Sequence, residues 1–414
     1  MTSPKALLPA LSLTLCLGAC CLVSPARADD DDNAKAVQAG LSITSELYSN
    51  LRGGLKRGST GLTNIYASLQ GNGGALWGMP GLTLFTQGLL VRGGDPSALT
   101  GDAQGASNIA ASHLNRLYEA WAQYNSDDSR WSVLGGLYDV NSEFDRLNSA
   151  SLFLNSSFGM DPSLAGSGPA GPSIFPATSV GVRVDYKPFK NVVWRTALLD
   201  DTPVYRDGAP DGPFAQNDGL LWISEWAWLD RAQSGEPPKD WQPDMVGRVS
   251  SLAPYDNKLA VGLWGYTHSQ AALDGGNNAR SSGLYVLLDR RLYVSGKLPG
   301  QVLGGFVQGA VASPQTNRFA RYLGLGLTLT QPFSQRPDDT AGIALALARN
   351  SRHYRPEGNT DDFGATEAAW ELSYQAAVNS WLSIQPDLQY IAHPDSRRDI
   401  GNALAFQLSV QVNL

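Results

Sequence analysis

The 414-residue sequence predicts an all-β fold, a 16-stranded antiparallel transmembrane β-barrel. Its last stretch, residues 404–414, alternates apolar residues with small or polar ones, which is the period-two pattern of a strand with one apolar and one polar face. The same pattern recurs along the chain. After residue 28 no apolar run approaches the roughly 18 residues of a spanning helix, so a membrane would have to be crossed by strands.

The first 28 residues have the features of a secretory signal peptide, with Lys5 before an apolar run over residues 6–23 and an Ala-x-Ala cleavage site ending at Ala28. In a competing interpretation, residues 17–20 are a lipobox and Cys20 is lipidated. Both interpretations predict export. The first divides the chain into a signal peptide (1–28), an N-terminal segment (29–40) and a β-barrel domain (41–414).

The composition argues against thiol chemistry and nucleic acid. Cys16, Cys20 and Cys21 all lie in the leader, so the cleaved protein would have neither a cysteine nucleophile nor a thiolate metal site. The net charge of −7 becomes about −9 when Lys5 and Arg27 are removed with the leader, and no basic run marks a nucleic-acid partner.

No enzyme, metal or cofactor site is expected. The four histidines, His113, His268, His353 and His393, have no metal-ligand spacing, and no phosphate-binding or dinucleotide-binding glycine motif precedes a helix. A Ser269 beside His268 is the only hint of a barrel hydrolase.

Alternation predicts sixteen strands, an even number that lets both chain termini lie on the periplasmic side of the membrane. The stretch 246–252 alternates poorly and is assigned to a connection. The strands are expected near residues 41–49, 61–70, 82–91, 116–124, 131–141, 179–186, 192–199, 220–228, 259–268, 283–292, 302–311, 321–331, 341–348, 366–378, 381–391 and 403–414.

The connections alternate between long and short, as in outer-membrane barrels with long external loops and short periplasmic turns. The exception is the long even-numbered connection over residues 229–258. The longest one, residues 142–178, is the third external connection and contains apolar residues around Phe153 and Phe175. We expect it to fold inward and narrow the channel, although a lid packed on neighbouring external loops is the alternative.

The segment 366–378 indicates which face meets lipid. Trp370, Leu372 and Tyr374 lie on one face, and Glu371 and Ser373 lie on the other. Aromatic residues toward strand ends are typical of the interfaces of a membrane barrel. The apolar face is therefore expected to point outward.

Several motifs resemble the carbohydrate-selective porin family, OprB type, from about residue 40 to the end. They are, in chain order, the segments 92–97, 117–121, 138–144, 153–159, 171–176 and 385–390. The sequence departs from the family pattern at Leu414, where such barrels usually end in phenylalanine, and in the long connection after Trp228.

The resemblance implies an outer-membrane porin through which sugars, monosaccharides such as glucose, diffuse passively into the periplasm. The implied localisation is the cell outer membrane of a Gram-negative bacterium. The expected partners are sugars, outer-membrane lipid and the outer-membrane barrel assembly machinery. Whether the barrels form homotrimers or stay monomers is left open, as is the identity of the sugar.

Inward positions, assigned by parity, supply groups that suit a sugar path. Sugar hydroxyls donate and accept hydrogen bonds, and the C–H face of the ring packs on aromatic rings. Arg183 and Arg195 are expected to give a positive field opposite the acids, although these charges could instead pair and hold the wall together. The predicted pore-lining residues are Glu119, Trp121, Asp139, Asn141, Glu143, Asn155, Arg183, Arg195 and Glu225.

Two function classes stay open from the residues alone. The first is a passive sugar porin. The second is a non-conducting outer-membrane β-protein that binds saccharide.

Overall fold

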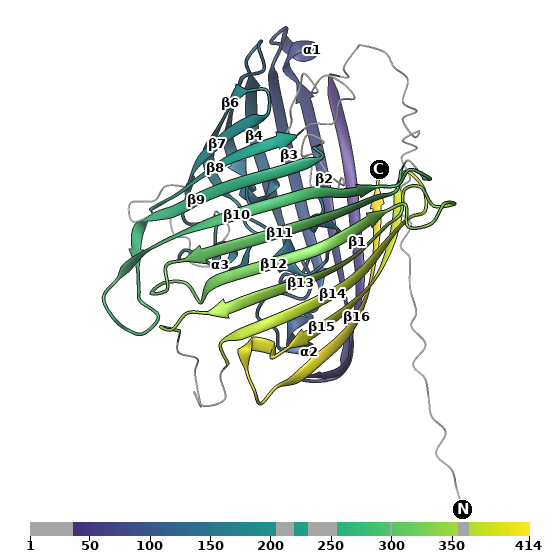
Figure 1. Ribbon diagram of the computed structural model, residues 1–414. Coiled ribbons are helices and arrows are strands. Elements are labelled where there is room, and N and C mark those ends of the chain that lie inside the picture. Colours follow the sequence, from purple (N-terminus) through teal and green to yellow (C-terminus); the bar gives the residue numbers. More distant parts are fainter. Residues whose placement is uncertain (1–35, 204–218, 231–254, 299, 355–363) are drawn as a thin grey trace, which may run out of the picture. The chain divides into compact units, whose positions relative to one another are not determined.

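The computed structural model describes residues 36–203, 219–230, 255–298, 300–354 and 364–414. Its sheet closes into a barrel of sixteen antiparallel strands, in which each strand pairs with its neighbours in sequence and β1 also pairs with β16 (Figure 1). The strands are β1 (Val37–Gly54), β2 (Gly58–Asn72), β3 (Leu82–Gly93), β4 (Leu114–Asn125), β5 (Trp131–Tyr138), β6 (Ser179–Phe189), β7 (Val192–Asp200), β8 (Leu220–Asp230), β9 (Asn257–Gln270), β10 (Ala279–Val294), β11 (Val302–Ala312), β12 (Phe319–Thr330), β13 (Thr340–Asn350), β14 (Thr366–Ala377), β15 (Leu382–Ala392) and β16 (Gly401–Asn413).

Each predicted segment overlaps one observed strand, so the predicted fold is confirmed. The first hairpin is longer than predicted, and its link is residues 55–57 instead of 50–60. Strand β5 ends at Tyr138 rather than at 141, because Val140–Ser142 forms the short helix η1. Strand β1 begins at Val37, inside the predicted N-terminal segment.

The predicted signal peptide, residues 1–28, and the alternative lipidation site Cys20 lie outside the described residues. The stretch 246–252 does so as well. Within the described part of the chain, no helix combines the length and apolar character needed to cross a bilayer.

The pairing of β1 with β16 closes the barrel over residues 42–54 of β1, and two further backbone hydrogen bonds extend this pairing at one rim. The backbone N–H of Leu41 donates to the carbonyl of Leu414 at 3.0 Å, and the reverse bond is 2.8 Å. Each of the sixteen described strands therefore has a partner on both sides, so the sheet that they form has no unpaired edge for lipid or another chain to meet.

The strands have an apolar outward face and a polar inward face. On β14, Trp370 and Leu372 are 46 % and 56 % exposed, whereas Glu371 between them is fully buried. On β16, Leu408 is half-buried on the outer face and Gln407 is 1 % exposed on the inner face. Since successive side chains of a strand point to opposite faces, this pattern assigns lipid to the outside.

Pro386 interrupts strand pairing without a bulge. It lies opposite Leu408 of β16, and the ladder with β14 on its other side keeps its register across a gap at residues 374–375. The sequence predicts a bulge here. Proline lacks only the backbone N–H that the ladder would use, so the strands lose pairing locally and need no inserted residue to accommodate it.

The longest connection, L3 (residues 139–178), folds into the barrel, as predicted. It contains η1, η2 (Ala150–Leu152), η3 (Ser156–Phe158) and α3 (Pro162–Ala165). The rings of Phe153 and Phe158 lie 5.8 and 6.0 Å from Phe306 on the inner face of β11. Gly342 of β13 makes room for the loop, because a Cβ atom there would lie 2.6 Å from Leu152.

A second connection, L2 (residues 94–113), also turns inward and carries the short helix α2 (Ser97–Thr100). It is joined directly to L3 by a hydrogen bond of 2.9 Å from the N–H of Ser156 to the carbonyl of Gly105. The interior of the barrel is therefore occupied by two loops in contact.

Replacing Leu408 by lysine should lower the free energy of unfolding by roughly 2–4 kcal/mol, because a charge would face the lipid in mid-strand. Lysine at Gln407 should cost less, since it faces inward, opposite the buried carboxylate of Asp387. Urea unfolding and the heat-shifted band on SDS gels measure both effects. Equal losses from the two substitutions would contradict the assignment of faces.

Candidate functional site

L3 is held to the inner wall by hydrogen bonds from its backbone N–H groups to carboxylates on four strands. A buried N–H needs an acceptor, and a carboxylate is a strong, charged one. These contacts run around much of the circumference of the barrel. The acceptors are Glu119 of β4 (from residue 139, 3.0 Å), Glu225 of β8 (from 145, 3.2 Å), Asp289 of β10 (from 149, 3.0 Å) and Glu371 of β14 (from 154 and 155, 2.5 and 3.0 Å).

An ion-pair cluster fixes the first part of L3 to β6 and β7. Glu143 of L3 accepts two hydrogen bonds from Arg183, at 3.0 and 3.2 Å. Arg195 forks onto Asp185 at 2.8 and 3.1 Å and donates to the carbonyl of Glu143 at 2.9 Å. Burial raises the pKa of Glu143, and the two guanidinium groups act in the opposite direction.

The two arginines expected to face the acids across the lumen thus lie in buried pairs at the base of L3. Arg183 is fully buried and Arg195 is 7 % exposed. Arg183 also donates to Gln123 at 2.7 Å and to the hydroxyl of Ser132 at 2.8 Å. This arrangement matches the alternative left open by the sequence, in which the charges pair with one another; here they hold the wall and L3 together.

Asp139 forms the entry of L3 together with two neighbours on β4. Its carboxylate accepts the Tyr118 hydroxyl at 2.5 Å and the N–H of Asn141 at 2.8 Å, which caps η1. Its backbone is bound by Glu119. Burial raises the pKa of Asp139 to about 6.

Glu225 is the centre of another cluster. Its carboxylate pairs with the ammonium group of Lys258 at 3.1 Å and accepts the Tyr285 hydroxyl at 2.8 Å. The N–H of Asp145 completes the set. Lys258 also donates to the carbonyl of Arg146 at 2.9 Å. In this cluster L3 is therefore bound both by a carboxylate, that of Glu225, and by an ammonium group, that of Lys258.

Asn155 is anchored at the opposite wall. Besides the bond from its N–H to Glu371, its amide donates to Gln389 of β15 at 3.4 Å and accepts the N–H of Ser157 at 3.1 Å, which caps η3.

Trp121 differs from the other candidates. It stacks on Phe85 of β3 with 4.9 Å between ring centroids and an interplanar angle of 24°.

The structure places all nine predicted residues inside the barrel and brings six of them into two groups. Asn155, Glu225 and Trp121 lie apart from these groups. Asn141 is half-buried, and the other eight are at most 7 % exposed. The two groups are Glu119, Asp139 and Asn141, and Glu143, Arg183 and Arg195.

Several loop-binding residues of the wall were not predicted as site residues. Parity alone places them inward, but nothing in the local sequence shows that each meets a loop. They are Lys258, Tyr285, Asp289, Gln308, Tyr322, Glu367, Glu371, Gln385 and Gln389.

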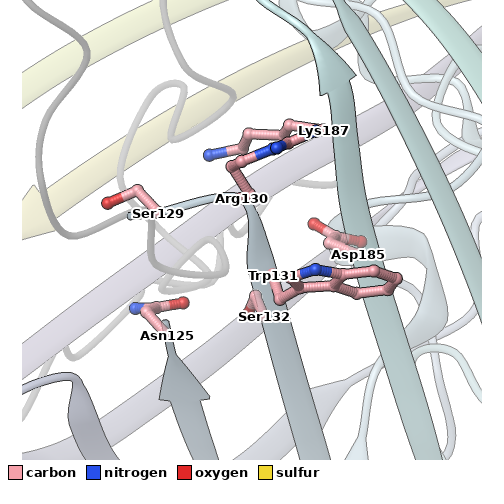
Figure 2. Close-up of a pocket in the computed structure, with 7 residues that line it drawn as sticks. All are labelled: Asn125, Ser129, Arg130, Trp131, Ser132, Asp185 and Lys187. Carbon is pink, nitrogen blue, oxygen red and sulfur yellow. The ribbon is translucent and has the colours of Figure 1, made fainter. Parts of the chain in front are cut away.

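A small hollow lies where the β4–β5 turn meets the end of β6 (Figure 2). Figure 2 shows Trp131 and Asp185 on one side of it and Asn125 and Ser129 on another, with Lys187 near Arg130. Its volume of about 10 Å³ is close to the least that holds one water molecule, so a sugar ring does not fit.

Among the described residues, no group of three or more His, Cys, Asp or Glu side chains is arranged to hold a metal ion.

Replacing Arg183 by alanine should lower the free energy of unfolding by about 3–5 kcal/mol, because Glu143 would stay buried without its closest cation. Alanine at Arg130, an exposed arginine in the β4–β5 turn, should change it by about 0.5 kcal/mol or less. Urea titration of the two variants in the same detergent measures the difference. Equal midpoints would show that the Arg183 pair does not stabilise the fold.

Comparison with known proteins places this barrel in a family. A profile described as the carbohydrate-selective porin, OprB family, matches residues 73–414. Porin B of Pseudomonas aeruginosa is 29% identical over 208 residues, which span 47% of this chain and 45% of Porin B. The chain thus aligns with about half the length of that relative.

Two solved structures share the fold. The high-pH structure of Pseudomonas putida OprB has a TM-score of 0.78 and 17% identity, covering 92% of this chain and 94% of that one. The low-pH structure of the same protein has a TM-score of 0.58 and 16% identity, covering 92% and 93%. The family resemblance in the sequence is confirmed: the chain belongs to the OprB family of carbohydrate-selective porins.

Proposed function

We propose that the protein is an outer-membrane porin that lets monosaccharides such as glucose diffuse passively into the periplasm. The observation that carries this proposal is L3 folded against the inner wall of a closed barrel, since a loop inside the lumen restricts what can pass. The family description supports the carbohydrate substrate class.

The nine predicted residues enter this proposal in two roles. Asn141 is half-buried, and we assign it to direct contact with sugar hydroxyls. Trp121 would offer an aromatic face near the path. The remaining seven would act indirectly, by fixing the loop that shapes the path.

The localisation and partners follow from the same proposal. A signal peptide over residues 1–28 would direct export, and the barrel assembly machinery would insert the chain into the outer-membrane lipid. The outward apolar face supports lipid as the surrounding solvent. The proposed function is compatible with both homotrimers and monomers.

The second candidate is a barrel that binds saccharide without conducting it. The contact of L2 with L3 inside the barrel favours it, because two joined loops leave less room for a sugar to pass.

Planar-bilayer recording separates the two candidates. The purified protein should produce stepwise ion conductance that falls when glucose is added, since a sugar in the lumen displaces ions. Liposomes containing it should swell in isosmotic glucose faster than empty liposomes. Saccharide binding without conductance or swelling would favour the second candidate.

Cell fractionation tests the localisation. The mature protein should extract with outer membranes and migrate differently on SDS gels before and after boiling, because a closed hydrogen-bonded barrel resists detergent unfolding. Amino-terminal sequencing should begin at Asp29. Recovery in the soluble periplasmic fraction would contradict the proposal.

A further inference from the structure

We propose that Glu367 and Glu371 are positioning residues that hold L2 and L3 together as one plate and so set the largest sugar that passes. This inference rests on the proposed sugar channel. Both residues lie on the inner face of β14, four positions apart, and each is fully buried.

Glu371 binds L3. One carboxylate oxygen accepts the N–H of Leu154 at 2.5 Å, and the other accepts the N–H of Asn155 at 3.0 Å. Because each oxygen has its own donor, an amide at this position would place an NH₂ group against one of the two N–H groups.

Glu367 binds L2 in the same manner. Its carboxylate accepts the N–H of Ala103 at 2.9 Å and the N–H of Gln104 at 3.0 Å. It also accepts the N–H of Asp395, in the connection between β15 and β16, at 2.5 Å. One residue thus ties L2 to β14 and to a neighbouring connection.

The two loops are then joined to each other. The N–H of Ser156 donates to Gly105 at 2.9 Å, and the N–H of Asn108 donates to the carbonyl of Leu154 at 2.8 Å. The Ser157 hydroxyl donates to the side chain of Gln104 at 3.0 Å. Backbone pairing in both directions gives L2 and L3 a common position.

Strand β15 completes the attachment. Gln389 donates to the carbonyl of Ala106 in L2 at 2.8 Å, and Gln385 donates to the carbonyl of Leu152 in L3 at 2.6 Å. The glutamates therefore accept the N–H groups and the glutamines donate to the carbonyls of the same plate. In these hydrogen bonds L2 and L3 supply backbone groups, and β14 and β15 supply side chains.

The attachment can fail without loss of the barrel, because the strand ladder uses none of these side chains. Losing one charge-assisted bond should raise the population of the released plate about tenfold or more. Released loops would leave a wider path, so large sugars should gain more than small ones.

The test compares E371Q and E367Q with the wild type and with D339N in liposome swelling with glucose, sucrose and raffinose. Asp339, in the connection between β12 and β13, is the control: it is a buried carboxylate that accepts the N–H of Ala377 at 3.0 Å and the guanidinium of Arg336 at 2.8 Å, and these partners lie outside L2 and L3. The quantity measured is the ratio of raffinose to glucose rates. A lower folded yield reduces both rates equally and leaves this ratio unchanged.

We expect the ratio to rise severalfold in E371Q and E367Q and to stay at the wild-type value in D339N. An unchanged ratio in both glutamate variants, with glucose still passing, would overturn the inference and leave the sugar channel intact. A wild type that passes no sugar would instead refute the proposed function.

Hydrogen exchange tests whether the two loops form one plate. E367Q, whose direct contacts are in L2 and in the connection between β15 and β16, should also speed exchange at the amides of Leu154 and Asn155 in L3, while the strands stay protected. Faster exchange confined to L2 would show that the loops move separately and would overturn the single-plate account.

Discussion

A loop that enters a closed barrel brings backbone N–H and C=O groups that the strand ladders cannot pair, because each strand already has two neighbours. The interior of this protein is organised around that constraint. Carboxylates on β4, β8, β10 and β14 accept the N–H groups of L3, and amides and hydroxyls on β11, β12 and β15 donate to its carbonyls.

The same constraint explains the inward charges. In a water-filled lumen, acidic and basic side chains would attract or repel solutes. Here Glu143 with Arg183, and Glu225 with Lys258, are buried pairs that also contact L3. Charge inside the barrel therefore mainly fixes the loop, while Asn141 of the loop stays half-buried.

Much of the fold could be predicted because period-two alternation is local. The pattern around Trp370 and Glu371 gave the correct faces. The prediction was wrong at the first link, which was placed over residues 50–60, because β1 continues to Gly54, where Gly53 and Gly54 have φ of +66° and +64°. The partners of the inward acids could not be predicted, because Glu371 and Leu154 are 217 positions apart and their contact depends on the route of L3.

The glycine at position 342 has a consequence for how the barrel is completed. The wall around it is built of small residues, and the space they leave is filled by Leu152 and Phe153 of L3. A globular core that loses such side chains can shrink, but the girth of a barrel is fixed by the number and stagger of its strands. The inner wall and L3 therefore have complementary surfaces, and a change in side-chain size on one requires a matching change on the other.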